Sequence, residues 1–266
     1  MNLIIFSKDR PAQLELLLRS FKTFWKDWDK QKIKVLFKVT NDEYFAGYKQ
    51  VVRIHPEFSY FNEDGISGTF KDILLSLMED EDPMTAFEVD DDVMIRPFDL
   101  TSPQVKRFLK DKSIMCVNIR MDHNYNYCAD SDKWMTVPKF TNDTWDWKYC
   151  SLDWAYPMSV VFNIFRTSEI KPLVKRLNWK GLELETKMAE NPLQNPKMIG
   201  FPKAKTLLVQ VNRVQEVATN KALNISPEEM NDIFLSGQRI KLEQLLNLDL
   251  NSCFYYPERL EWEKYE

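Results

Sequence analysis

The chain has 266 residues, 44% of them hydrophobic, and a formal net charge of −4. A chain of this length can bury a sizeable core as one domain, and its negative charge argues against nucleic acid as a partner. Only 6 glycines occur, the 13 prolines are scattered, and no low-complexity tract or repeat divides the chain. We therefore expect a single domain without linkers.

The first strand-to-helix unit begins at the N-terminus. Residues 3–6 form a continuous apolar run, and Ser-Lys-Asp-Arg-Pro follows at residues 7–11. Pro11 suits a first helical turn, where its missing N–H costs nothing. An apolar stripe then recurs at helical spacing through Leu14, Leu17, Leu18 and Phe21. This pattern predicts a strand followed by an amphipathic helix.

Further elements alternate in the same way. A strand is predicted at residues 33–40, and a helix at residues 70–78 follows Ser67-Gly68-Thr69. The apolar run that ends near Val89 predicts the next strand. Alternating strands and helices are typical of an α/β fold with a mostly parallel sheet, which binds ligands at the carboxyl ends of its strands.

An acidic run, Asp90-Asp91-Asp92, directly follows this third strand. Adjacent carboxylates repel one another, and a divalent cation relieves that repulsion. Hard oxygen ligands suit Mg²⁺ or Mn²⁺. The alternative is a charged turn whose acidic side chains are simply solvated.

The order of these motifs resembles the nucleotide-sugar half of GT-A glycosyltransferases, of the family-2-like and exostosin-like kind. The motifs are the strand with Ser-Lys-Asp-Arg-Pro, the Leu-rich helix and Val-Asp-Asp-Asp-Val at residues 89–93. The resemblance covers about residues 1–215 and is strongest in the first hundred. It implies a GT-A-like three-layer α/β/α sandwich with a mixed sheet. Its parts would be a nucleotide-sugar half (1–100), an acceptor half (101–215) and a C-terminal helical extension (216–266).

The resemblance also implies an activity. A hexosyl or N-acetylhexosaminyl group would pass from a nucleoside diphosphate donor, with UDP favoured, to a glycan, lipid-linked or other acceptor. Peripheral membrane contact is compatible with a lipid-linked acceptor, although no dense basic amphipathic segment is present. The sequence does not indicate the sugar, the acceptor or the stereochemical outcome, because acceptor loops determine these.

By resemblance, the donor residues lie in both early motifs. Asp92 would hold Mn²⁺ or Mg²⁺, with Asp90 on the ribose side as a second candidate metal ligand. Asp91, between them, is expected to face away from the metal. Arg10 would supply a cation for the diphosphate, or alternatively pair with Asp9 on the surface. The donor-contacting set is Phe6, Ser7, Arg10, Asp90, Asp91 and Arg213.

Candidate bases for an inverting reaction lie in the acceptor half. Glu183 and Glu185 begin a helix that ends near residue 191, and they cannot share one helical face. We expect Glu183 to be the base, with Asp153 as the second candidate. The alternative is that the helix-start carboxylates only interact favourably with the helix dipole.

Three later segments complete the pattern. Residues 125–156 contain four tryptophans and four tyrosines, which would form either an acceptor-binding wall or core. Strands are predicted at residues 158–166 and 206–211, and Asn212 and Arg213 after the second could contact the diphosphate or the acceptor. Ser226 would cap a helix ending at Gly237.

The four cysteines and two histidines have no metal-binding spacing, so we expect free thiols and no structural zinc. The first apolar run is too short for a signal peptide or a membrane span. These features predict a cytoplasmic protein. Two other functions remain: a nucleotidyltransferase, which would favour a Gly-rich first loop that residues 7–11 lack, and a non-catalytic sugar-nucleotide-binding protein.

Overall fold

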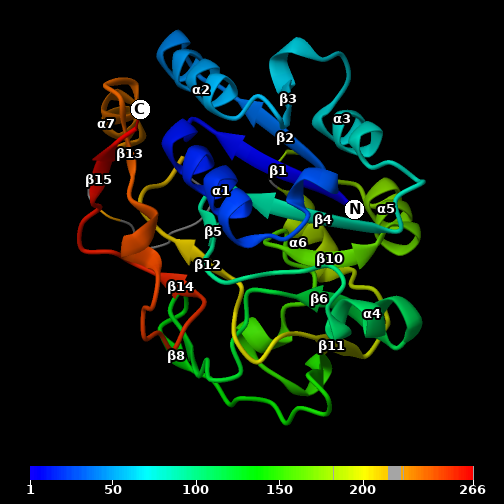
Figure 1. Ribbon diagram of the computed structural model, residues 1–266. Helices are drawn as coiled ribbons and strands as arrows, with labels where there is room; N and C mark the ends of the chain where they lie inside the picture. Colours follow the sequence, from blue (N-terminus) through cyan, green and yellow to red (C-terminus); the bar gives the residue numbers. More distant parts are fainter. Residues whose placement is uncertain (182, 215–222, 224, 266) are drawn as a thin grey trace.

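The computed structural model describes residues 1–181, 183–214, 223 and 225–265. Its centre is an eight-stranded sheet with helices on both sides (Figure 1). Six strands run in one direction, and the fifth and eighth run the opposite way. Their order is β3 (Ser59–Asn62), β2 (Lys32–Lys38), β1 (Asn2–Lys8), β4 (Met84–Val89), β10 (Asn163–Arg166), β6 (Ile114–Asn118), β11 (Lys197–Ile199) and β9 (Thr144–Asp146).

Two hydrophobic cores lie on the two faces of the sheet. The side chains of β1 alternate between them, since Leu3 and Ile5 join one core and Ile4 joins the other. One core includes α1 (Pro11–Phe24), α2 (Asp42–Ile54), α4 (Pro103–Lys110) and α7 (Pro227–Leu235). The other includes α3 (Phe70–Leu77), α5 (Thr167–Arg176) and α6 (Glu183–Glu190). The predicted α/β/α sandwich with a mostly parallel mixed sheet is confirmed.

A smaller sheet of three strands lies beside the carboxyl end of β4, because its first strand follows β4 after only two residues. It consists of β5 (Asp92–Met94), β12 (Thr206–Val209) and β14 (Phe254–Tyr255). Two further antiparallel pairs join β13 (Gln238–Ile240) to β15 (Trp262–Lys264), and β7 (Tyr127–Cys128) to β8 (Lys133–Trp134). The 3₁₀ helices are η1 (Trp28–Lys30), η2 (Glu63–Gly65), η3 (Trp147–Tyr149), η4 (Leu152–Ala155) and η5 (Leu242–Leu245).

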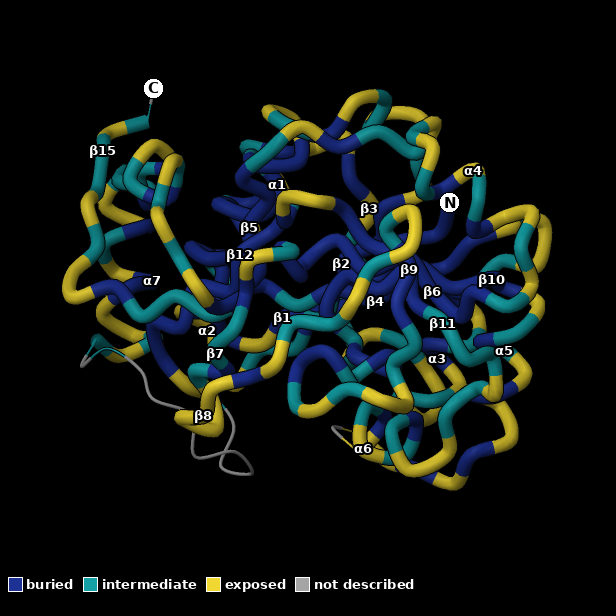
Figure 2. Tube along the Cα trace, turned by 90° about the horizontal axis from the view of Figure 1, so that it is seen from below, coloured by how far each residue is buried: buried dark blue, intermediate teal, exposed yellow. Residues whose placement is uncertain are grey.

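Figure 2 shows that burial is concentrated in the strands, while exposed positions lie on loops and outer helix faces. The strand predicted at residues 158–166 is shorter than expected and occupies only β10, because the preceding residues form an irregular segment in which Phe162 has a positive φ of 35°. The helix predicted after Ser226 is confirmed as α7, and the Ser226 side chain accepts a hydrogen bond from Glu229 N.

The C-terminal segment is only partly described, since residues 215–222, 224 and 266 lie outside the described residues. Its described part contains α7 and also three strands, β13, β14 and β15. Figure 1 shows α7 beside α1 and α2, away from α3 and α5. None of the described helices is both long and apolar enough to cross a membrane.

Gly47 is where α2 closely approaches α1 and α7. A Cβ at this position would lie 2.5 Å from Pro11 Cγ and 2.2 Å from Asn231 Oδ1. We expect Gly47→Ala to destabilise the fold by about 1 to 3 kcal/mol, the usual range for overpacking, and thermal unfolding measures this as a lower Tm.

Gly65→Ala is the matched control, because a Cβ there meets nothing within 4 Å. An unchanged Tm in Gly47→Ala would contradict the close packing of these three helices.

Candidate functional site

The turn between β1 and α1 is fixed by Asp9. Its φ of 55° lies in the left-handed region, which Asp tolerates better than most residues. Its Oδ1 accepts a hydrogen bond from Thr40 N at 2.8 Å, and its own N–H donates to Lys38 O at 3.3 Å. Asp9 therefore ties the end of β1 to the end of β2, and Arg10 is directed toward the end of β4.

Ser7, Tyr48 and Asp90 form a buried hydrogen-bond network at the carboxyl ends of the parallel strands. Ser7 Oγ donates to Asp90 Oδ2 at 2.8 Å and lies 2.5 Å from the Tyr48 hydroxyl. Lys8 N also donates to Asp90 Oδ2, at 3.3 Å. Burial raises the pKa of Asp90 to about 6, although the Arg10 charge opposes that rise. The structure thus brings together two of the predicted donor residues, Ser7 and Asp90.

All three nitrogens of the Arg10 guanidinium donate hydrogen bonds inside the protein. Its Nη1 donates to Asp90 Oδ1 at 3.1 Å and to Asp91 Oδ2 at 2.9 Å. Its Nε donates to Asn212 Oδ1 at 3.0 Å, and Nη2 donates to the Asn212 carbonyl. Gln13 also donates to Asn212 Oδ1, at 3.0 Å. Arg10 therefore connects the β1–α1 turn, the acidic run and the segment after β12, rather than pairing with Asp9.

Asp92, the last residue of the acidic run, and Glu88, which lies two residues before the run, are completely buried. Neither oxygen of Asp92 has a hydrogen-bond partner among the described residues, and the same holds for Glu88 Oε2. Burial raises the pKa of Asp92 to about 7, and nearby Thr206, Glu88 and Arg120 counteract this. Burial, with the adjacent Asp92, raises the pKa of Glu88 well above its usual range.

Arg120 lies two residues after the end of β6. It is therefore at the same carboxyl-end edge of the sheet as Ser7 and Asp90. Asn118 Oδ1 accepts hydrogen bonds from the backbone N–H groups of Arg120 and Met121, at 3.1 and 2.8 Å. Burial alone would lower the pKa of Arg120, but Cys253, Asp153, Asp92 and Glu185 raise it on balance. We call Arg120, Asp92, Asp153 and Glu185 the Arg120 cluster.

The two helix-start glutamates have different surroundings. Glu183 is exposed, and its Oε2 accepts a hydrogen bond from Lys180 N at 2.9 Å, as in a helix-start contact. Glu185 is half-buried, accepts from Val160 N at 3.1 Å, and contributes to a raised pKa of Tyr156. Asp153, in η4, is buried with Oδ2 unpartnered among the described residues. The structure brings Glu185 and Asp153 near Arg120, but not Glu183.

The remaining predicted contacts differ in accessibility. Phe6 is half-buried and stacks on Phe87, with ring centroids 5.9 Å apart. Arg213 is exposed. In the aromatic segment, Trp145 and Trp154 belong to the core, whereas the Trp134 side chain is 72% exposed on β8. The aromatic segment therefore supplies both core and accessible surface.

Tyr48 and Arg120 are among the residues of this site that were not predicted from the sequence. Tyr48 lies on α2, whose signals were the N-cap Asn41 and the helical spacing of its buried residues Tyr44, Tyr48 and Val51. Arg120 follows the apolar run of β6, which was a recognisable strand signal.

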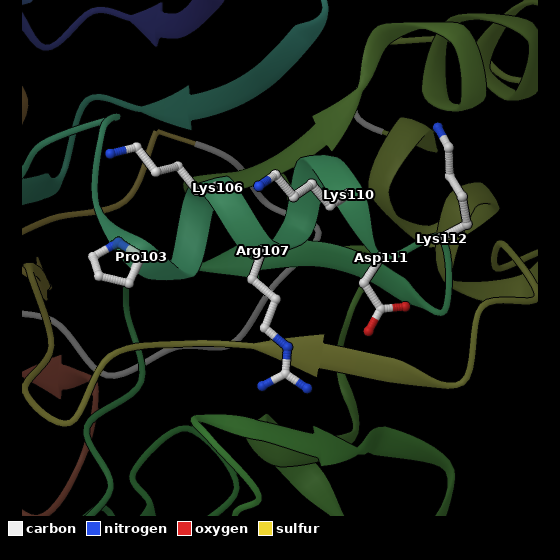
Figure 3. A pocket seen from close by; sticks show the side chains of 6 residues that line it. All are labelled: Pro103, Lys106, Arg107, Lys110, Asp111 and Lys112. Carbon is white, nitrogen blue, oxygen red and sulfur yellow. The ribbon is translucent and has the colours of Figure 1, made fainter.

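A basic surface hollow lies elsewhere (Figure 3). Its volume is about 750 Å³, and it is lined by Pro103, Lys106, Arg107, Lys110, Asp111 and Lys112. Because α4 leads into the first residues of β6, the hollow is at the amino-terminal edge of the parallel strands. It is therefore separate from the site around Asp90 and Arg120.

A metal would find few protein ligands here. Within the described residues, no three His, Cys, Asp or Glu side chains are arranged to hold an ion. The oxygens of Asp90 are already bonded to Arg10 and Ser7, whereas those of Asp92 are buried and unpartnered. Mg²⁺ often takes one or two carboxylates and completes its shell with substrate phosphates and water. The Asp92 carboxylate fits the role of such a metal ligand.

Comparison with known proteins also finds a glycosyltransferase. The chain is 25% identical over 195 residues to "Bifunctional glycosyltransferase pgtA" of Dictyostelium discoideum. The chain resembles a glycosyltransferase. This match covers 65% of the chain and 25% of the relative, so the chain spans about a quarter of that protein's length. The resemblance predicted from the sequence is confirmed. No protein-family model matches the chain.

Two solved structures show a partial likeness to this chain. A 1–349 fragment of S. aureus TarS in complex with UDP-GlcNAc is 14% identical, with a TM-score of 0.46, covering 81% of this chain and 60% of that one. A cytidylyltransferase from Leptospira borgpetersenii is 14% identical, with a TM-score of 0.44, covering 77% of this chain and 76% of that one.

Arg10 should be required for stability. Arg10→Gln leaves two buried or half-buried carboxylates, Asp90 and Asp91, without their cation, which typically costs about 3 to 5 kcal/mol. Chemical denaturation should show this loss in the free energy of unfolding.

Lys26→Gln provides the comparison, because the Lys26–Asp99 pair is exposed and such pairs contribute little. A stability of Arg10→Gln equal to that of the wild type would show that the network does not hold the three segments together.

Proposed function

We propose that this chain is a glycosyltransferase that takes a sugar from a nucleoside diphosphate donor, with UDP favoured, and uses Mn²⁺ or Mg²⁺. The acceptor would be a glycan, a lipid-linked molecule or another hydroxyl compound. The observation that carries the proposal is the acidic run at the carboxyl end of β4, where the buried Asp92 carboxylate has no hydrogen-bond partner among the described residues. The similarity to a glycosyltransferase over 195 residues supports it.

Different residues of the site would bind the donor and the acceptor. Phe6 is accessible enough to stack on the base, and Asp90 is held rigidly by Ser7 and Arg10 on the expected ribose side. Asp92 would be the metal ligand. The bound ion would neutralise charge that develops on the leaving diphosphate. Arg10 would act chiefly by positioning Asp90 and Asp91.

The acceptor hydroxyl must lose a proton if the reaction inverts the anomeric centre. Glu185 and Asp153 are better placed for this than Glu183, because both contribute to the electrostatic environment of Arg120. Glu185 is half-buried on α6, whose buried neighbours Leu184 and Met188 fix its orientation. We therefore assign Glu185 as the base, with Asp153 as the alternative.

A ligand screen tests the function directly. UDP, GDP, CMP and their sugars are added with and without Mn²⁺, and binding to the folded state raises Tm. A UDP-sugar with Mn²⁺ should give the largest shift. Turnover of CTP with a sugar phosphate would instead identify a nucleotidyltransferase, and donor binding without any transfer would identify a binding protein.

Asp92→Asn should abolish the Mn²⁺-dependent part of UDP binding, measured by calorimetry, because it removes a charged oxygen ligand. The fold should persist, since Asn has nearly the same size and no buried charge to desolvate. Asp29→Asn, an exposed position on η1, is the control and should bind as the wild type does. Wild-type UDP affinity with Mn²⁺ in Asp92→Asn would remove the proposed metal role.

The two glutamates of α6 give a matched test of the base. Glu185→Gln should lower the transfer rate at saturating donor by about 10²- to 10⁴-fold, the usual effect of removing a general base, with donor Kd unchanged. Glu183→Gln should transfer at a nearly normal rate. The opposite result would restore Glu183 as the base, and a normal rate in Glu185→Gln and Asp153→Asn would point to a retaining reaction.

A further inference from the structure

The Arg120 side chain is an unusual buried cation. It is 3% exposed, and its Nε and Nη2 have no hydrogen-bond partner among the described residues. Arg166 is equally buried, but both of its Nη groups donate to backbone carbonyls, those of Phe108, Asp111 and Ile114. Buried polar groups are nearly always paired, so two open donors on one guanidinium require an explanation.

Unpartnered acceptors lie around these donors. Asp92 and Asp153 both have buried oxygens without partners among the described residues, and both raise the pKa of Arg120. The opposite charges are therefore neighbours, yet no hydrogen bond joins them. Donors and acceptors in this arrangement are typical of a site that a polar ligand or ordered water completes.

The charge and position of Arg120 suit a phosphate. A guanidinium presents a planar fork that matches phosphate oxygens. The charges of Asp92, the proposed metal ligand, and of Asp153 and Glu185, the candidate bases, all act on Arg120. Arg10 was the cation expected for the donor, but its donors are occupied by Asp90, Asp91 and Asn212.

We propose that Arg120 binds the diphosphate of the donor beside the bond that breaks, which rests on the proposed function. In that step the bond from the anomeric carbon to the diphosphate oxygen breaks, and its electron pair stays on the diphosphate. The acceptor oxygen bonds to the anomeric carbon, and its proton passes to the base, Glu185 or Asp153. Arg120 stabilises the negative charge that develops on the leaving oxygen.

The test compares Arg120→Gln and Arg120→Lys with the wild type by calorimetry in the presence of Mn²⁺. The probes are UDP, UMP and uridine, replaced by GDP, GMP and guanosine if the screen favours guanine. Arg120→Gln should weaken the nucleoside diphosphate about 10- to 100-fold, the range for a charge-assisted hydrogen bond. Arg120→Lys should give a smaller loss, because it keeps the charge but not the fork. Nucleoside affinity should be unchanged in both variants, which also shows that they fold.

Arg166→Gln is the control, since Arg166 is bonded to backbone carbonyls. This variant should have a lower Tm than the wild type but the same preference for diphosphate over nucleoside. Equal diphosphate affinity in Arg120→Gln and wild type overturns the assignment. Equal losses for diphosphate and nucleoside also overturn it, because they indicate a structural role. A wild-type protein that binds none of the probes overturns the proposed function itself, which separates the two failures.

Discussion

The burial of several carboxyl groups within five residues at the end of β4 is the constraint that organises this end of the molecule. Glu88, Asp90 and Asp92 are each no more than 3% exposed. Like charges this close are unfavourable in a medium of low dielectric. The protein must therefore neutralise, pair or ligate each of them, and each has a different solution.

Asp90 and Asp91 are paired through Arg10, which requires the β1–α1 turn and the segment after β12 to meet at this point. Burial and the neighbouring Asp92 raise the pKa of Glu88 well above its usual range. Asp92 has no such ion pair. Burial raises its pKa to about 7, Thr206, Glu88 and the charge of Arg120 oppose that rise, and neither of its oxygens has a hydrogen-bond partner among the described residues. Among the three aspartates of the acidic run, Asp92 is thus the one whose oxygens are both unpartnered among the described residues, and it is the one that the resemblance marks for a metal.

Local patterns predicted the elements that bring these groups together. The β1–α1 unit and α3 were recognised because their apolar spacing and their helix-start residues, Pro11 in the first turn of α1 and Thr69 before α3, act within a few residues. The meeting of Ser7 and Asp90 followed from the rule that parallel strands present their carboxyl ends at one edge. By contrast, the shortness of β10 depends on its antiparallel pairing with β4 and β6, which no local pattern encodes.

For the same reason, the direction in which individual side chains point could not be predicted from the sequence. Helical geometry showed that Glu183 and Glu185 cannot share a face, but the packing of Leu184 and Met188 against the second core decides which one faces inward. Likewise, the sequence could not show that Asn212, 202 residues from Arg10, would occupy its guanidinium. Assigning Arg10 to phosphate was reasonable from its position after a strand, and its contacts argue for a supporting role.

The two arginines at this edge therefore differ in how they are satisfied. Each of the three guanidinium nitrogens of Arg10 donates a hydrogen bond within the protein, so its charge stabilises the folded site before any ligand arrives. Arg120 is surrounded by negative groups that raise its pKa on balance, but its Nε and Nη2 have no hydrogen-bond partner among the described residues. Donors that are already held in place in this way need no rearrangement when charge develops on a bound ligand. Within this one cluster of carboxylates, the contacts of Arg10 therefore indicate a structural role, and those of Arg120 indicate ligand recognition.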